Sequence, residues 1–143
     1  MELTDEQRAF IEEPRFAVAA TISGDGTPHQ TVVWYAVEDD GVIVSTPNGS
    51  LKHKHLLRDP RLSLCVEDGL RYVTVSGRVT IDDEPKAAGE LYARMGQRYR
   101  GTMASGPIDA SPPRLDPKTM ELLSRERVTL RLSVDRLRSN GFG

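Results

Sequence analysis

The chain has 143 residues, which suits a single domain spanning residues 1–143. Charged residues make up 28% of it and hydrophobic residues 38%, a balance that excludes a wholly disordered chain. Its 19 basic and 21 acidic side chains give a net charge of -2. Because nucleic-acid-binding proteins normally carry a basic excess, we expect no nucleic-acid partner.

The first third of the chain predicts a short helix and three strands. The helix over residues 4–13 begins at Thr4, which has capping-box spacing to Gln7, and ends before Pro14. Strands follow over residues 16–22, 28–37 and 42–46, separated by clusters of turn-forming residues. Because apolar side chains occupy both faces of the strand at 28–37, we expect this strand to lie in the middle of the sheet.

The remainder of the chain predicts three more strands and further helices. A short helix over residues 50–58 has Ser50 as its N-cap, and a longer helix spans residues 84–99. Strands are predicted over residues 62–67, 71–81 and 128–134, with Gly77 marking a bulge or a close approach. Residues 100–115, rich in glycine and proline, predict a mobile loop of the kind that serves as a lid, and a last short helix begins at Asp116.

The order of these elements predicts a mainly β fold. The connections between strands are mostly too short for parallel crossovers, so about six strands should form an antiparallel sheet. Closing such a sheet removes its exposed edges, and we therefore expect a β-barrel with flanking helices.

The sequence predicts a soluble, cytoplasmic protein that does not enter a membrane. No apolar run reaches the roughly 18 residues that a membrane-spanning helix needs. The N-terminus carries Glu2, Asp5 and Glu6 rather than the basic and apolar regions of a secretory signal. Cys65 is the only cysteine and cannot form an internal disulfide, which suits a reducing compartment.

The helix over residues 50–58 carries the most informative chemistry. Lys52 and Lys54 lie near its N-terminus, where the helix dipole already disfavours positive charge. A bound phosphate would offset this cost, since free N–H groups at a helix N-terminus attract anions. Nearby hydroxyl donors are Ser45, Thr46 and Ser50. The alternative, a solvated basic face on a surface helix, remains open.

Trp34 and Tyr35 form the other notable pair. A tryptophan in a strand more often packs in the core than binds a ligand. Next to a phosphate site, however, the same apolar strand could wall a flat aromatic ring while its backbone groups contact the polar edge of that ring.

No metal site or side-chain nucleophile is predicted. His53 and His55 are two residues apart, so their rings would diverge on a helix, and the chain has only three histidines. Cys65 lies among apolar residues and should pack as a small hydrophobe. The sequence contains no nucleophile elbow, phosphate loop or dinucleotide fingerprint, so it identifies no catalytic residue.

Taken together, these segments resemble the pyridoxamine-phosphate-oxidase-like family of FMN-binding split β-barrels. The resemblance covers roughly Glu6 to Val134 and is carried by residues 26–35, 42–46, 57–61 and 75–79 and by Ser50 with Lys52. Within this family the chain is most similar to the small proteins that use the deazaflavin coenzyme F-420. The vitamin-B6 oxidases of the family end in Arg-Leu-x-Pro, whereas residues 136–139 here read Arg-Leu-Arg-Ser, so oxidation of pyridoxamine phosphate is not expected.

The resemblance implies a homodimer with two cofactors in grooves between the subunits. It implies that Val33 and Trp34 line the cofactor ring and that Ser50 and Lys52 hold its phosphate. The further contacts that it implies are Lys54 and Arg58 for an anionic tail and, from the partner subunit, Tyr72, Arg78 and Tyr99.

The function that the resemblance implies is an F-420-dependent oxidoreductase that passes a hydride to a small substrate with an electron-poor double bond. The cofactor supplies this chemistry, and Tyr35 or Tyr99 is a candidate proton donor. An FMN-dependent oxidoreductase of the same family is the alternative, because both cofactors carry a phosphate. F-420 also has a polyglutamate tail, for which Lys54, Arg58 and Arg61 offer positive charge. A third hypothesis is a non-catalytic carrier of a flavin-like ligand or haem.

Overall fold

A computed structural model of the chain describes residues 2–39, 41–99, 117–118 and 126–142. The loop predicted over residues 100–115 lies outside the described residues, as does most of the short helix predicted after it. The described helices are α1 (Asp5–Glu12), α2 (Leu51–Arg58) and α3 (Pro85–Tyr99). The described strands are β1 (Ala17–Ile22), β2 (Pro28–Val33), β3 (Tyr35–Glu38), β4 (Gly41–Pro47), β5 (Arg61–Asp68), β6 (Arg71–Asp82) and β7 (Arg127–Asn140).

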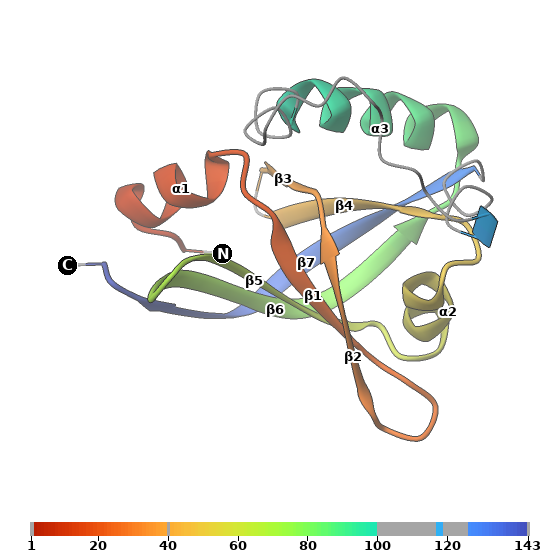
Figure 1. Cartoon of the computed structure of the whole chain (residues 1–143), viewed down its shortest axis with the longest axis horizontal. Helices are drawn as coiled ribbons and strands as arrows, with labels where there is room; N and C mark the ends of the chain where they lie inside the picture. Colours follow the sequence, from red (N-terminus) through yellow and green to blue (C-terminus); the bar gives the residue numbers. More distant parts are fainter. Residues whose placement is uncertain (1, 40, 100–116, 119–125, 143) are drawn as a thin grey trace.

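The strands form one antiparallel sheet in the order β2-β1-β5-β6-β7-β4-β3. β2 and β3 are consecutive in the chain, yet they lie at opposite ends of this order and are joined only through Trp34. The sheet therefore curls so that its two edges approach each other, which makes a half-barrel (Figure 1). The prediction of a mainly β, antiparallel, barrel-like fold is confirmed.

The prediction of one central strand over residues 28–37 is wrong. The chain leaves β1 at Val33 and pairs with β4 from Tyr35, so this segment supplies both edge strands, and seven strands are described instead of about six. Val32 shows the consequence, because 67% of its surface is exposed on the chain by itself. The alternation of side chains continues through Trp34, which is why the pattern gave no sign of the change of partner.

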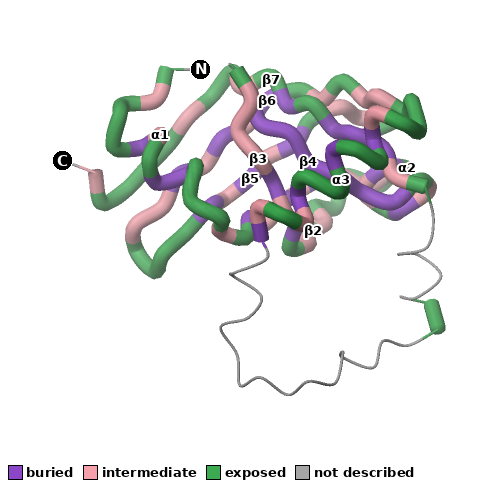
Figure 2. Tube along the Cα trace, turned by 90° about the horizontal axis from the view of Figure 1, so that it is seen from above, coloured by how far each residue is buried: buried purple, intermediate pink, exposed green. Residues whose placement is uncertain are grey.

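The core fills the inside of the curled sheet. β4 and β7 illustrate the alternation, because Val42 and Val44 face inward and pair with Leu132 and Leu130, all of them buried. In β1, β5 and β6 buried residues alternate with half-buried ones, whereas β4 is buried along nearly its whole length (Figure 2). At Gly77 the register between β6 and β7 shifts, and an added Cβ would collide with the Ser133 carbonyl, so the bulge and close approach predicted there are both present.

Helix α3 packs on the outside of the sheet, above β4 and β7 (Figure 1). Leu91, Met95 and Tyr99 form a second apolar cluster with Ile43, and Trp34 packs against this cluster. The outward-facing Ile43 of β4 therefore helps to position α3 on the sheet, and α3 in turn positions the Trp34 side chain.

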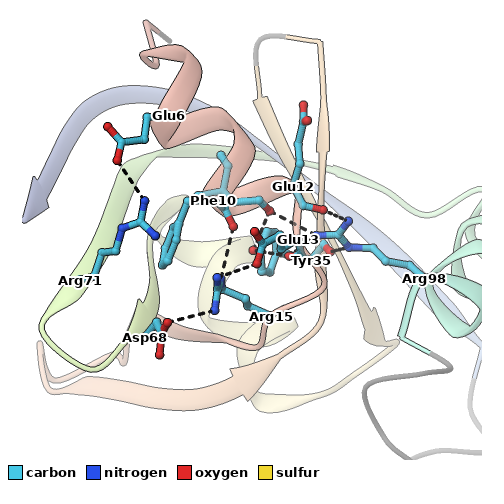
Figure 3. A network of polar contacts seen from close by, with 10 residues as sticks. Glu6, Phe10, Glu12, Glu13, Arg15, Tyr35, Asp68, Arg71 and Arg98 are labelled. Carbon is cyan, nitrogen blue, oxygen red and sulfur yellow. Dashed lines mark hydrogen bonds and ion pairs between the residues drawn. The ribbon is translucent and has the colours of Figure 1, made fainter. Parts of the chain in front are cut away.

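Helix α1 is fastened at both ends. Thr4 and Gln7 form the predicted capping box at its start. At its end, the guanidinium of Arg98 from α3 donates hydrogen bonds to the carbonyls of Ile11, Glu12 and Glu13 and to that of Tyr35, at distances of 2.7–3.2 Å (Figure 3). The Ile11, Glu12 and Glu13 carbonyls lie at the end of α1, where they have no intrahelical partner, so Arg98 completes the C-terminus of this helix from another element.

No helix in the described part of the chain is both long and apolar enough to cross a lipid bilayer.

Candidate functional site

A pocket of about 290 Å³ lies where β4 and β7 pass beneath α3, next to the first turn of α2. Its lining residues are Val32, Val33, Trp34, Ser45, Thr46, Pro47, Lys52, Tyr92, Met95 and Arg127. Half of these, namely Val33, Trp34, Ser45, Thr46 and Lys52, are residues that the sequence predicts to bind a cofactor. The structure thus brings the predicted ring wall and the predicted phosphate contact to one cavity.

Lys52 is a half-buried cation with no carboxylate partner among the described residues. It is the second residue of α2, where the helix dipole is also unfavourable for a positive charge. Burial and, to a smaller extent, the neighbouring charge of Arg127 lower the pKa of Lys52 below its ordinary value. A partly desolvated charge that lacks a counter-ion is costly, so this position is unfavourable unless an anion binds there.

The turn before α2 fixes the position of Lys52. The Ser50 hydroxyl accepts a hydrogen bond from the His53 backbone N–H at 3.3 Å and shares another with the Thr46 hydroxyl at 3.0 Å. The Gly49 N–H donates to Nδ1 of His53 at 2.9 Å, and burial lowers the pKa of that imidazole. Ser50 is therefore the predicted N-cap, but it does not line the pocket.

Trp34 contributes to the pocket from a stack of aromatic rings. Its indole lies parallel to the Tyr99 ring with centroids 4.9 Å apart, and Tyr99 stacks in turn on Phe16 at 5.8 Å. The Trp34 side chain therefore packs on a buried ring of α3, which supports the apolar wall of the pocket.

Tyr35 and Tyr99, the two candidate proton donors, do not line the pocket. The Tyr35 hydroxyl donates to the Ile11 carbonyl at 2.7 Å, and burial raises the pKa of this phenol. The Tyr99 hydroxyl donates to the Arg15 carbonyl at 2.6 Å and accepts from the Tyr35 N–H at 3.1 Å. Both side chains are buried and hold backbone groups together, so neither is placed to deliver a proton in this pocket.

Arg127 is the lining residue that sequence reasoning missed. Its Nε donates to the Ser45 hydroxyl at 3.0 Å and its Nη2 to the Ser45 carbonyl at 3.1 Å. The guanidinium also lies over the Tyr92 ring, 4.3 Å from the centroid, and burial lowers its pKa. Its Nη1 is buried and makes no hydrogen bond within the described structure. The only signal in the sequence was the alternation of β7, which places Arg127 on the outward face with Thr129 and Arg131.

The other predicted contacts lie away from this pocket. Lys54 and Arg58 are exposed on α2, and Nη2 of Arg58 donates to the Ile22 carbonyl at 3.1 Å, near the β1–β2 turn. Arg61 forms an ion pair with Asp59 at 2.7 Å. Tyr72 is half-buried on β6, and Arg78 lines a separate pocket of about 450 Å³ on β1, β5, β6 and β7. The structure does not bring these residues to Lys52.

The histidines and the cysteine also lie apart from the pocket. Nδ1 of His55 is 2.9 Å from the Thr21 hydroxyl, and its ring contacts that of His29 edge to face, whereas His53 is bonded to the turn before α2. Within the described residues, no three or more His, Cys, Asp or Glu side chains come together as metal ligands would. Cys65 is only partly buried, because it faces away from the core that holds its neighbours Leu64 and Val66.

Comparison with known proteins gives consistent results. The model of the family described as pyridoxamine 5'-phosphate oxidase matches residues 3–132. An F-420-dependent biliverdin reductase of Mycobacterium tuberculosis is 30% identical over 100 residues, which are 68% of this chain and 73% of that protein. A pyridoxine/pyridoxamine 5'-phosphate oxidase of Kineococcus radiotolerans is 30% identical over 89 residues, or 62% of this chain, but only 40% of that protein's length is matched.

Solved structures with the same fold include both named and uncharacterised proteins. A conserved hypothetical protein of Mycobacterium tuberculosis has a TM-score of 0.72 and 31% identity, with 97% of this chain and 85% of that chain covered. A structure described as an F-420 reductase also has a TM-score of 0.72, with 22% identity and with 95% and 98% of the two chains covered. At that identity the second likeness concerns the fold alone.

Proposed function

The chain belongs to the pyridoxamine 5'-phosphate oxidase family, and from this premise we propose that it is an oxidoreductase that holds the deazaflavin F-420 in the pocket between Lys52 and Trp34. Relatives in this family are oxidoreductases. For the present chain we propose in addition that the cofactor is F-420, that Lys52 contacts its phosphate and that Val33 and Trp34 line its ring.

The observation that carries the proposal is the unpaired, half-buried Lys52 at the first turn of α2. An ammonium group in this position gains most from a phosphate, which neutralises its charge and also accepts from the free N–H groups of the helix end. The side chains of Ser50, Thr46 and His53 form hydrogen bonds within this turn, so the backbone that carries Lys52 is held in place. The chemistry of the donor set therefore fits a cofactor phosphate.

The apolar side of the pocket fits the ring of such a cofactor. Val33 and Trp34 form a wall at the point where the chain passes from β2 to β3, and Met95 of α3 lies on the same pocket. A bound flavin or deazaflavin supplies hydride-transfer chemistry, so the protein needs to provide only position and exclusion of water. This agrees with a pocket in which the titratable side chains of the lining are Lys52, Tyr92 and Arg127.

FMN is the second candidate cofactor. It is favoured by the family as a whole, since the oxidase of Kineococcus radiotolerans matches the same chain. F-420 is favoured by the mycobacterial biliverdin reductase, which matches more of this chain and more of its own length. Biliverdin is therefore the first substrate to test, as a tetrapyrrole whose conjugated double bonds can accept a hydride.

We also propose that the protein is a cytoplasmic homodimer. In a dimer, the predicted cofactor contacts that lie outside this pocket would have a role. Tyr72 and Arg78 do not line the pocket that holds Lys52, and in a homodimer they would face the cofactor held by the other subunit. Lys54 and Arg58 are exposed at the α2 surface, where they would meet an anionic tail.

The proposal is tested by titrating the purified protein with F-420 and, separately, with FMN while cofactor fluorescence is recorded. We expect saturable binding of F-420 and an affinity loss of about 100-fold or more for Lys52→Glu, because the variant puts a carboxylate beside the phosphate. Lys86→Glu makes the same charge change at an exposed position of α3 and should bind normally. Circular dichroism checks that both variants fold. Normal binding by folded Lys52→Glu would overturn the phosphate assignment.

Turnover separates an enzyme from a carrier. Reduced F-420 mixed with biliverdin or a panel of enones should be consumed in the presence of the protein, and consumption should stop in Lys52→Glu. Tight binding with no consumption of any substrate in the panel would favour the carrier hypothesis instead.

A further inference from the structure

We propose that Arg127 is a second phosphate ligand of this pocket, held ready for the anion by Ser45 of β4 and Tyr92 of α3. The inference rests on the proposed function, because it concerns the same pocket. It adds a residue from the last strand, far in sequence from the α2 segment, and it assigns a task to helix α3.

The hydrogen bonds of Arg127 leave one donor group unused. Nε and Nη2 are both bonded to Ser45, through its hydroxyl and its carbonyl, so the guanidinium plane is fixed by two contacts to one residue. Nη1 is buried and has no partner within the described structure. Buried donors are nearly always satisfied in proteins, and an unsatisfied one on a residue that lines a cavity is the kind of group that a bound water or anion would satisfy.

The charge of Arg127 is also left without a carboxylate partner among the described residues. Of the described residues that line the pocket, Lys52 and Arg127 are cations and none is a carboxylate. They are close enough for the charge of Arg127 to disfavour protonation of Lys52. Two like charges that share one partly desolvated cavity are unfavourable, and an anion bound between them removes both the repulsion and the unmet donor. A phosphate group, with several acceptor oxygens, can accept from both side chains at once.

Tyr92 sets the position of the guanidinium on the other side. Its ring lies 4.3 Å from the guanidinium carbon, in the geometry of a cation–π contact. Tyr92 is itself 38% exposed and is carried by α3, which packs on β4 through Leu91 and Met95. Ser45 and Tyr92 are thus positioning residues, and Arg127 is the group that contacts the anion.

The test compares affinities for F-420 and for FMN by fluorescence titration, together with the rise in Tm that inorganic phosphate produces. Arg127→Gln should weaken cofactor binding by about tenfold or more and clearly reduce the phosphate-induced rise in Tm, because Lys52 remains as the only other cation of the described lining. Arg131→Gln is the matched control, because Arg131 lies on the same strand but is exposed and paired with Glu38 at 2.9 Å. It should bind cofactor within about twofold of the unmodified protein, as expected for a surface ion pair.

A second pair of variants leaves the buried charge untouched. Tyr92→Phe keeps the ring beneath the guanidinium and should retain affinity, whereas Tyr92→Leu removes the ring and should weaken binding by about threefold to tenfold. This pair decides the question if Arg127→Gln does not fold. Equal binding by the two Tyr92 variants would then overturn the positioning role.

The outcomes separate this inference from the proposed function. If folded Arg127→Gln binds both cofactors normally while Lys52→Glu does not, Arg127 is structural and only this inference fails. If neither substitution changes binding, the pocket does not hold the cofactor and the proposed function fails as well. A lower Tm in Arg127→Gln with unchanged affinity and an unchanged response to phosphate would also mark a purely structural residue.

Discussion

Two half-buried arginines, Arg98 and Arg127, differ in how many of their hydrogen-bond donors have acceptors. At the junction of α1 and α3, Arg98 donates four hydrogen bonds, all to backbone carbonyls (Figure 3). Its guanidinium also lies near the Tyr35 and Tyr99 rings. At the pocket, Arg127 makes two hydrogen bonds to described residues, both to Ser45, and its buried Nη1 has no partner among them. Both side chains are half-buried and both contact a tyrosine, so burial by itself does not distinguish them.

The two arginines differ in how far their hydrogen-bond donors and their charge are matched by neighbouring groups. Arg98 meets partial negative charge that the fold provides, because the last carbonyls of α1 have no intrahelical partners. Arg127 and Lys52 have no carboxylate partner among the described residues. A buried cation whose N–H donors all have acceptors stabilises the fold. A buried cation without a counter-ion lowers the stability of the fold until an anionic ligand binds. The comparison predicts that substitutions in the two regions will change stability in opposite directions.

The largest effect is expected at Arg98. Arg98→Ala removes four hydrogen bonds and leaves the end of α1 uncapped, so the free energy of unfolding should fall by about 2–4 kcal/mol. Urea denaturation followed by circular dichroism measures this change. Arg94→Ala, on the same helix at an exposed position, should cost less than about 0.5 kcal/mol. A cost at Arg98 no larger than that at Arg94 would remove the basis of the comparison.

Lys52→Met should act in the opposite direction. Removing a desolvated, unpaired charge and keeping an apolar stem should raise the Tm of the cofactor-free protein by about 2 °C, while cofactor affinity falls. Lys86→Met serves as the exposed control and should leave both quantities unchanged. A clear decrease in Tm for Lys52→Met would show that the ammonium group is already satisfied.

The pH dependence tests the same charge without a change in the fold. The folded-state pKa of Lys52 is lowered, so the unfolded chain binds the proton more tightly. Between the lowered pKa and about 10.5, the stability of the cofactor-free protein should therefore rise with pH relative to Lys52→Met. Cofactor affinity should fall through the same interval, by up to about tenfold per pH unit, because the bound anion favours the protonated amine. An affinity that stays constant until pH 10.5 would contradict the shift.

The features that depend on residues close together in the chain could be predicted from the sequence. Thr4 and Ser50 could be identified as N-caps because the cap and the N–H group that it accepts from are neighbours in the chain. Lys52 could be singled out for the same reason, since its conflict with the helix dipole is a local property. The antiparallel sheet followed from the short connections between its strands.

The parts that could not be predicted depend on pairing across the fold. Nothing in residues 28–37 shows that the chain changes partner at Trp34, because the inward and outward alternation is the same on both sides of it. The role of Arg127 could not be predicted, because it depends on contacts with Ser45 and Tyr92, which belong to two other elements. The aromatic stack under Trp34 likewise unites residues of α3 and of the segment before β1.

The smallest effect is expected at the outer edge of the α1 region. Glu6 and Arg71 form an ion pair at 3.2 Å, but their side chains are 56% and 39% exposed. Glu6→Gln should lower the free energy of unfolding by no more than about 0.5 kcal/mol, and the difference should vanish in about 1 M salt, because exposed charges are well screened by water and ions. Arg71 keeps its contacts with the Phe10 and Phe142 rings in the variant, so no buried charge is left unmet. Urea denaturation at low and high salt measures the change. A loss approaching that of Arg98→Ala would mean that ion pairing, rather than the satisfaction of buried donors and carbonyls, stabilises this region.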